Sequence, residues 1–147
     1  MAFNRVHFSS LVTDVATPQA LFDALNSEFG FTMDVCASAD NAKCEVYMAL
    51  SDSFSALARP WEGTCWMNPP YGRHIGKWLE KAFDSARLGA TVVCLIPSRT
   101  DTRWWHKFVM RAEEIRFIKG RLKFGGMKQN CPFPSAIVVF RPPKVGV

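Results

Sequence analysis

The chain has 147 residues, 48% of them hydrophobic and 21% charged, and no apolar run reaches membrane-spanning length; this favours one soluble globular domain over disordered or membrane-embedded classes. The N-terminal residues lack the apolar core of a secretory signal, and five cysteines without a Cys-x-x-Cys pair indicate reduced thiols in a cytosol and no metal site. The net charge of +5 is uneven, because residues 99–147 hold 11 Lys/Arg against 3 Asp/Glu. This basic third favours a polyanionic partner, although a solvated face that aids solubility explains it equally well by itself.

The first predicted element is a helix that begins at Thr17-Pro18, because Thr is a good N-cap and Pro suits the first helical position. Gly30 would end this helix. Its buried face would comprise Leu21, Phe22 and Leu25. Taken locally, the Thr17-Pro18 pair indicates a helix start and nothing more.

Residues 31–38 predict a short strand, with Asp34 close to its carboxyl end and small residues after it that let a backbone approach a ligand. A carboxylate there could receive the ammonium group of a cofactor that carries an amino acid, and an Asp that caps the next turn is an equally good interpretation. Residues 43–50 predict a short strand or helix, and the pattern does not decide which. Further on, Asp52 could accept a hydrogen bond from an adenine amine while Phe54 covers the ring; the alternative is a surface Asp and a core Phe.

Residues 61–67 predict a strand that ends abruptly in the loop Asn68-Pro69-Pro70-Tyr71. Proline biases the preceding residue toward extended geometry, so Asn68 is expected at the end of a strand, where ligands bind in an open α/β sheet. An exocyclic amine on a purine or pyrimidine is a poor nucleophile because its lone pair is delocalised into the ring. The Asn68 side-chain oxygen and the Pro69 carbonyl could accept both N–H bonds and localise that lone pair, while Tyr71 could stack on a base rotated out of a duplex. The alternative is an ordinary proline turn.

A helix is expected next, because apolar residues recur every three or four positions over 75–86 and Gly89 follows. The continuous apolar run 91–96 is typical of a buried parallel strand, so the strand, loop, helix and strand together predict a βαβ unit. The remaining predicted elements are a helix capped by Thr100 or Asp101 that runs to about Met110, and strands over 114–118 and 135–140.

Basic and aromatic side chains gather in the C-terminal third. Arg99 and Arg103 flank two tryptophans that could hold phosphates and stack on bases, with core filling as an equal alternative. Arg121 and Lys123 belong to a basic, glycine-rich segment in which Phe124 could clamp an extruded base.

Several motifs follow one another in order: Thr17-Pro18-Gln19, Phe31-x-x-Asp34-x-x-Ala37, Trp61-x-Gly63, Asn68-Pro-Pro-Tyr-Gly72, Leu95-Ile-Pro-Ser-Arg-Thr-Asp-Thr and Gly120-Arg121-x-x-Phe124. Together they resemble the DNA N6-adenine methyltransferase family of phages and prophages, from about residue 15 to residue 142. The Asn-Pro-Pro-Tyr loop itself resembles motif IV of amino-methyltransferases that use S-adenosylmethionine.

The resemblance implies an α/β fold, namely a small single-domain Rossmann-like S-adenosylmethionine-dependent methyltransferase with a mostly parallel sheet and helices on both faces. The domain would cover residues 1–147 without a separate target-recognition domain. The resemblance further implies S-adenosylmethionine as cofactor, DNA as partner, N6-methyladenine as product, and the cytoplasm of a bacterial host as the location of a phage- or prophage-encoded enzyme.

Roles for single residues follow from the same resemblance. The catalytic residues would be Asn68, Pro69, Pro70 and Tyr71. The cofactor-binding residues would be Thr17, Pro18, Asp34, Cys36, Ala37, Asp52, Phe54 and Asn68. The substrate-binding residues would be Tyr71, Arg99, Arg103, Arg121, Lys123 and Phe124. One departure is notable: larger methyltransferases carry Phe-x-Gly-x-Gly after the first strand, whereas residues 35–39 contain no glycine, so the cofactor site must be abridged.

Two other functions fit the same residues. One is methylation of RNA or of protein glutamine, because the loop is also similar to that of protein glutamine methyltransferases, which act on a planar amide, and of some RNA enzymes. The basic C-terminal third disfavours a protein substrate. The other is a degenerate DNA-binding module, which would bind DNA in a salt-sensitive manner and would not bind the cofactor.

Overall fold

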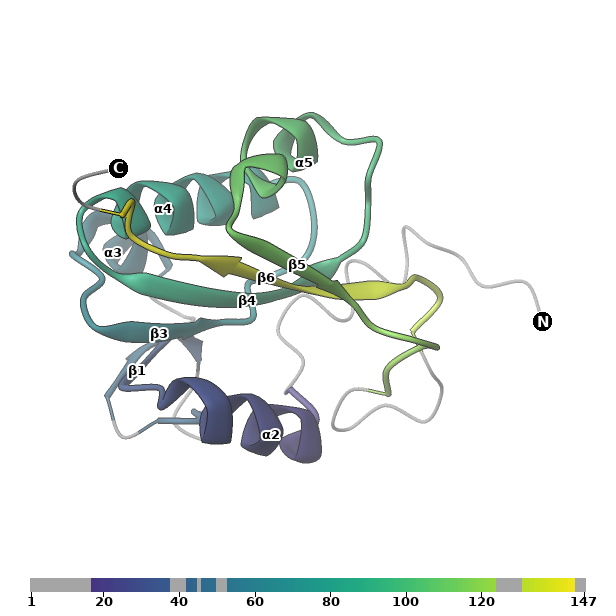
Figure 1. Cartoon of the computed structure of the whole chain (residues 1–147), viewed down its shortest axis with the longest axis horizontal. Coiled ribbons are helices and arrows are strands. Elements are labelled where there is room, and N and C mark those ends of the chain that lie inside the picture. Colours follow the sequence, from purple (N-terminus) through teal and green to yellow (C-terminus); the bar gives the residue numbers. More distant parts are fainter. Residues whose placement is uncertain (1–16, 38–41, 45, 50–52, 124–130, 145–147) are drawn as a thin grey trace.

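The computed structural model describes residues 17–37, 42–44, 46–49, 53–123 and 131–144. In chain order its elements are α2 (Gln19–Phe29), β1 (Met33–Ala37), β2 (Tyr47–Ala49), α3 (Ser53–Ala58), β3 (Thr64–Met67), α4 (Ile75–Arg87), β4 (Thr91–Pro97), α5 (Arg103–Lys107), the 3-10 helix η2 (Val109–Arg111), β5 (Glu114–Phe117) and β6 (Ser135–Phe140) (Figure 1).

The described strands form one sheet of six, in the order β2-β1-β3-β4-β6-β5. The strands β2, β1, β3 and β4 are mutually parallel, whereas β6 runs antiparallel to both of its neighbours. The expected α/β class is confirmed, but the sheet is mixed and not mostly parallel. The physical reason is that no helix is described between β5 and β6, and a parallel pair needs a crossover connection, usually helical.

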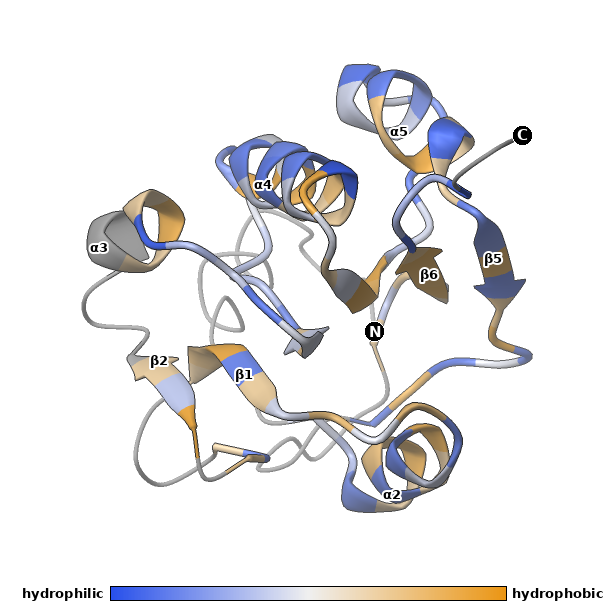
Figure 2. Ribbon diagram, turned by 60° about the vertical axis from the view of Figure 1, so that its left-hand side comes forward, coloured by the Kyte–Doolittle hydropathy of each residue, from blue (hydrophilic) through white to orange (hydrophobic). Residues whose placement is uncertain are grey.

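Helices cover both faces of this sheet. Figure 2 shows α3, α4 and α5 in a row on one side and α2 on the other. The apolar interior lies against β4 and β6, in which every residue but Thr91 is buried. None of the described helices is long and apolar enough to cross a membrane.

The predicted βαβ unit is confirmed by β3, α4 and β4. The apolar residues of α4 recur at helical spacing and are buried, as a helix packed on a sheet requires. The strands β3 and β4 pair in parallel register from Thr64 with Thr91 to Met67 with Cys94. The residue after Met67 therefore leaves the sheet at the carboxyl ends of the parallel strands, at the right-hand end of Figure 1.

The helix after Thr17 forms as predicted and ends at Gly30, whose φ of 69° lies in the left-handed region that favours glycine. The predicted cap is wrong. Pro18 is the N-cap, its carbonyl accepts from the Phe22 N–H, and no side chain caps the helix. The Thr17 hydroxyl is therefore available for a different contact.

Other boundaries also differ from the sequence prediction. The undecided segment 43–50 contains the strand β2, and α3 was not anticipated because six residues are too few to show a period. The helix α5 is capped by Thr102, whose hydroxyl accepts from the Trp105 N–H, and not by Thr100 or Asp101. It ends at Lys107, and η2 continues the chain to Arg111.

The sheet order contains one reversal that matters for ligands. From β1 the chain first adds β2 on one side and then β3 on the other, so β1 and β3 flank a topological switch point. Ligands of open α/β sheets bind outside the carboxyl ends of the strands at such a point.

Candidate functional site

Asn68 follows directly on β3, at the switch point. Its strand is buried from Cys65 to Met67, and Asn68 itself is half-buried beside the buried Pro69. Two prolines after the strand fix the backbone and remove two N–H donors, so the loop cannot continue the sheet. The polar side chain is thus held at the edge of an apolar core.

Hydroxyl groups hold the Asn68 amide from two sides. Its Nδ2 donates to Thr17 Oγ1 at 2.9 Å, and its Oδ1 accepts from the Tyr71 hydroxyl at 3.0 Å. Thr17 lies just before α2, whereas Asn68 lies just after β3, so the two residues are 51 positions apart in the sequence. The structure therefore brings the predicted cofactor segment and the predicted catalytic loop into direct contact.

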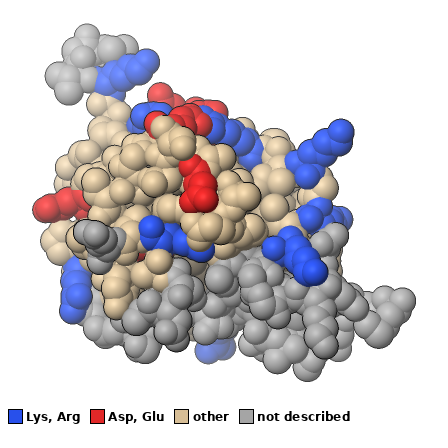
Figure 3. Space-filling view, turned by 90° about the horizontal axis from the view of Figure 1, so that it is seen from below, with Lys and Arg blue, Asp and Glu red and all other residues tan. Residues whose placement is uncertain are grey.

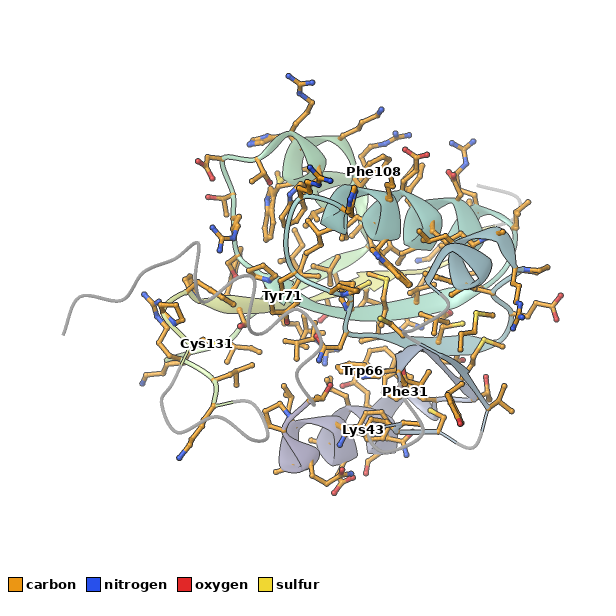
Figure 4. All side chains as sticks on the ribbon, turned by 180° about the vertical axis from the view of Figure 1, so that it is seen from behind. Phe31, Lys43, Trp66, Tyr71, Phe108 and Cys131 are labelled. Carbon is orange, nitrogen blue, oxygen red and sulfur yellow. The ribbon has the colours of Figure 1, made fainter. Side chains whose placement is uncertain are left out.

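Tyr71 lies inside the protein. It is 4% exposed, and its hydroxyl also lies 3.3 Å from the Leu95 carbonyl of β4. Its ring packs edge-on against Phe133, with 5.7 Å between the ring centres, and Figure 4 shows Tyr71 at the same end of the sheet as Cys131. Burial raises the pKa of Tyr71 well above its usual value, so the hydroxyl stays protonated and acts as a hydrogen-bond donor. Stacking of this ring on a base stays a prediction.

Asp34 is the second residue of β1 and does not lie near its carboxyl end, which corrects the sequence prediction. Its carboxylate is buried and accepts from the backbone N–H groups of Cys36, at 3.1 Å, and of Lys43, at 3.0 Å. Burial raises the pKa of Asp34 to about 6, although these two hydrogen bonds favour the ionised form. The observed contacts match the turn-capping alternative.

The other predicted cofactor residues fall into two groups. Cys36 and Ala37 are buried at the end of β1, and Pro18 is half-buried at the start of α2. Asp52 and Phe124 lie outside the described residues, and only the backbone of Phe54 is described, in α3.

The predicted substrate-binding cations lie at the same edge of the sheet. Arg99 follows β4 and is half-buried, and Arg103, Arg121 and Lys123 are exposed. Together with further cations on the loops after β3, β4 and β5 they form a basic rim, which comprises Arg73, Arg99, Arg103, Lys119, Arg121 and Lys123. In the described stretches 68–74, 98–103 and 118–123, Asp101 is the single carboxylate. In Figure 3, which views the α2 side, Lys and Arg occur across the whole face, and toward its right-hand end no Asp or Glu of the described residues is seen beside them.

Sequence analysis missed one participant in this site, Phe133, and one contact, the hydrogen bond between Thr17 and Asn68. Phe133 supports Tyr71 and lies under the Arg99 guanidinium, and Thr17 binds Asn68 directly. The available signal for Phe133 was an aromatic residue fixed between two prolines just before a strand. Among the described residues, no group of three or more His, Cys, Asp or Glu is placed to hold a metal ion.

Comparison with known proteins identifies the family. A family profile described as "DNA N-6-adenine-methyltransferase (Dam)" matches residues 9–143. The DNA N-6-adenine-methyltransferase of Haemophilus phage HP1 (strain HP1c1) is 30% identical over 136 residues, which cover 86% of this chain and 78% of that protein. A putative methyltransferase of Escherichia coli (strain K12), YfdM, is 38% identical over 63 residues, which cover 37% of this chain and 67% of that protein. The predicted family is confirmed: the chain belongs to the Dam family of DNA N-6-adenine-methyltransferases.

Proposed function

We propose that this DNA adenine methyltransferase takes its methyl group from S-adenosylmethionine, and that Asn68 and Pro69 orient the adenine N6 amine for the transfer. The observation that carries the residue roles is the fixed amide of Asn68 at the carboxyl end of β3, bound to Thr17 and Tyr71. The alternatives of an RNA or glutamine methyltransferase and of a degenerate binding module share this loop, and the experiment below distinguishes them.

The amine of adenine needs a change of electron distribution to become a nucleophile. Two carbonyl oxygens, of the Asn68 side chain and of the Pro69 backbone, can accept its two N–H bonds and draw the lone pair out of the ring. Neither oxygen is charged, which suits a neutral amine. As the N–C bond forms, the nitrogen becomes positive, so hydrogen bonds to these oxygens strengthen in the transition state. The surplus proton then leaves to solvent.

The described residues fit the proposed cofactor at the switch point. Parallel pairing of β1 with β3 brings Ala37 and Asn68 to one edge, and the Thr17–Asn68 hydrogen bond adds the start of α2 to it. Cys36 and Ala37 are small, so a ligand can approach the backbone there. When bound, S-adenosylmethionine supplies a methyl group on a sulfonium sulfur that leaves as a neutral thioether.

Asp34 would serve this cofactor indirectly. Both of its carboxylate oxygens accept from backbone N–H groups, of Cys36 and of Lys43, so it links Lys43 to β1. This link takes over part of the role that a glycine-rich loop has in larger methyltransferases. We keep Pro18, Asp52 and Phe54 as proposed cofactor neighbours on the strength of the family resemblance. A Rossmann-like origin of the sheet is supported by the switch point between β1 and β3.

The basic rim is the surface that we assign to the DNA backbone. Its cations surround the loop that holds Asn68, whereas the opposite edge of the sheet has Glu62 and Glu113 as well as Arg141 and Lys144. A polyanion is therefore attracted to the edge at which the chemistry takes place. Phe124 and Tyr71 remain our candidates for contact with the extruded adenine. We place the reaction in the cytoplasm of a bacterial host, in keeping with five free cysteines.

The experiment that tests the function is methylation of a DNA duplex, followed by digestion to nucleosides. We expect N6-methyladenine from the unaltered protein and a loss of about 100-fold or more in rate for Asn68→Ala. The matched control is Asn26→Ala, which removes an amide that accepts from the Phe31 N–H far from the site. Methylation of RNA or of protein, with DNA left unmethylated, would support the alternative methyltransferases. DNA binding without binding of S-adenosylhomocysteine would support the degenerate module.

A further inference from the structure

The contact between Thr17 and Asn68 has no role in building the helix α2. Thr17 is 5% exposed, and its hydroxyl does not cap the helix, because Pro18 is the N-cap and no side chain bonds to the first turn. Its described hydrogen bond instead joins it to the Asn68 side chain, at 2.9 Å and across 51 positions of the sequence. The buried Thr17 hydroxyl bonds the side chain of Asn68, the proposed catalytic residue, and does not cap the helix; this indicates a functional use.

The opposite atom of the same amide is held by Tyr71. The Tyr71 hydroxyl is 3.0 Å from Asn68 Oδ1 and 3.3 Å from the Leu95 carbonyl, and burial keeps it protonated. Tyr71 thus fixes the oxygen, and Thr17 fixes the nitrogen. An asparagine with only one of these partners could rotate about its side-chain bonds, since the torsion that turns an amide is broad and shallow.

The orientation of this amide decides whether the proposed chemistry can occur. The amine of adenine has two N–H donors, and it needs an acceptor from Asn68. If the amide turned, its own N–H groups would meet those of adenine, and the lone pair would stay delocalised. Resting on the function proposed above, we infer that Thr17 is a positioning residue, whose hydroxyl holds Asn68 Nδ2 so that Oδ1 is presented to the adenine amine.

The test compares Thr17→Val with Thr17→Ser. Valine has the shape of threonine and no hydroxyl, and serine keeps the hydroxyl. We expect kcat of Thr17→Val to fall about tenfold, the value of one neutral hydrogen bond, and the Kd for S-adenosylhomocysteine to change by a smaller factor than kcat. Thr17→Ser should recover most of kcat. Thr32→Val is the matched control, because its hydroxyl bonds the Thr64 backbone at the opposite end of β3.

A second measurement does not depend on catalysis. The side-chain NH2 resonances of Asn68, assigned with Asn68→Ala, should shift in Thr17→Val, return in Thr17→Ser and stay in place in Thr32→Val. Unchanged kcat or unchanged resonances in a folded Thr17→Val protein would overturn the inference. So would a weakened Kd for S-adenosylhomocysteine at constant kcat, which would make Thr17 a cofactor contact only. If Thr17→Val shows these resonance shifts but the unaltered protein makes no N6-methyladenine, the proposed function is refuted instead.

Discussion

The guanidinium of Arg99 lies 5.3 Å from the centre of the Phe133 ring and thereby joins the segment after β4 to the segment before β6. The same ring packs edge-on against Tyr71, whose hydroxyl binds Asn68. Arg99 was predicted to hold a phosphate. In the structure its cation also lies over the aromatic ring that packs against Tyr71 of the proposed catalytic loop, so Arg99 and Asn68 are connected through two packed aromatic rings.

Phe133→Leu should distinguish the ring contacts of Phe133 with Arg99 and Tyr71 from its apolar packing in the core. Leucine keeps most of the apolar volume but loses the cation–π contact with Arg99 and the ring contact with Tyr71. We expect a loss of about 1–3 kcal/mol in the free energy of unfolding and a fall of several-fold in kcat. Thermal or denaturant unfolding and a methylation assay measure the two effects.

Phe140→Leu is the matched control for that variant. Phe140 is equally buried, at 2%, and packs edge-on against Phe83 at the far end of β6. Its loss of stability should be similar while kcat stays unchanged. If both variants lowered kcat to the same extent, the effect would come from the sheet in general and not from support of Tyr71.

Asp34 should give the stability of the protein a characteristic dependence on pH. Burial raises its pKa to about 6 in the folded chain, against 3.8 in the unfolded chain, so the folded state holds the proton more tightly. The contribution of Asp34 to stability is therefore fully present below pH 3.8 and is lost as the pH rises through 6, by up to about 3 kcal/mol.

The difference between the unaltered protein and Asp34→Asn isolates this contribution. Glu28 and Glu114 have pKa values lowered by hydrogen bonds to Arg116, which gives the opposite slope, but they are the same in both proteins. Denaturant unfolding between pH 4 and 7 should show the unaltered protein losing stability relative to the variant as the pH rises. A difference that stays constant over this range would contradict the assigned burial of the carboxylate.

The periodic features of the sequence predicted the fold well, because each depends on local backbone preferences or on one repeating pattern of apolar residues. The apolar stripe of α4, the continuous run of β4 and the glycine after α2 each had one physical interpretation, and all three are present. The loop at Asn68 could be placed at a strand end for the same reason, since prolines restrict their own neighbours.

The partners of polar side chains could not be predicted in this way. The Thr17-Pro18 pair has every property of a helix cap, yet its hydroxyl binds a residue 51 positions away, because folding brings the start of α2 to the end of β3. Asp34 was ambiguous between a ligand and a cap until the register of β1 and its two backbone hydrogen bonds were known. Phe133 had no periodic context at all.

The basic rim should govern the salt dependence of DNA binding. Arg121→Glu combined with Lys123→Glu removes two exposed cations next to the site. We expect the slope of log K against log salt to become shallower by about 1.8, because each phosphate contact contributes about 0.9. Lys144→Glu, at the opposite edge of the sheet, is the control and should leave the slope unchanged. Equal slopes for both variants would show that DNA does not contact this part of the rim.

Gly72 allows a test of how strictly the proposed catalytic loop must be oriented. Its φ is 140°, and a Cβ added to it would meet no atom within 4 Å, so Gly72→Ala introduces backbone strain without a clash. Gly89, with a φ of 118° and equally open space, lies before β4 at the opposite edge. Each substitution should cost about 1–2 kcal/mol of unfolding free energy.

Gly72 adjoins Tyr71, and its carbonyl accepts from the Ile75 N–H at the start of α4, so strain there turns the loop that carries Asn68. We therefore expect kcat to fall about tenfold or more in Gly72→Ala and to stay unchanged in Gly89→Ala. Denaturant unfolding should show equal losses of stability in the two variants, so a difference in methylation rate reports the orientation of the loop alone. Equal rates in the two variants would mean that the loop tolerates rotation. Asn68 would then be positioned by its hydroxyl partners without help from the backbone.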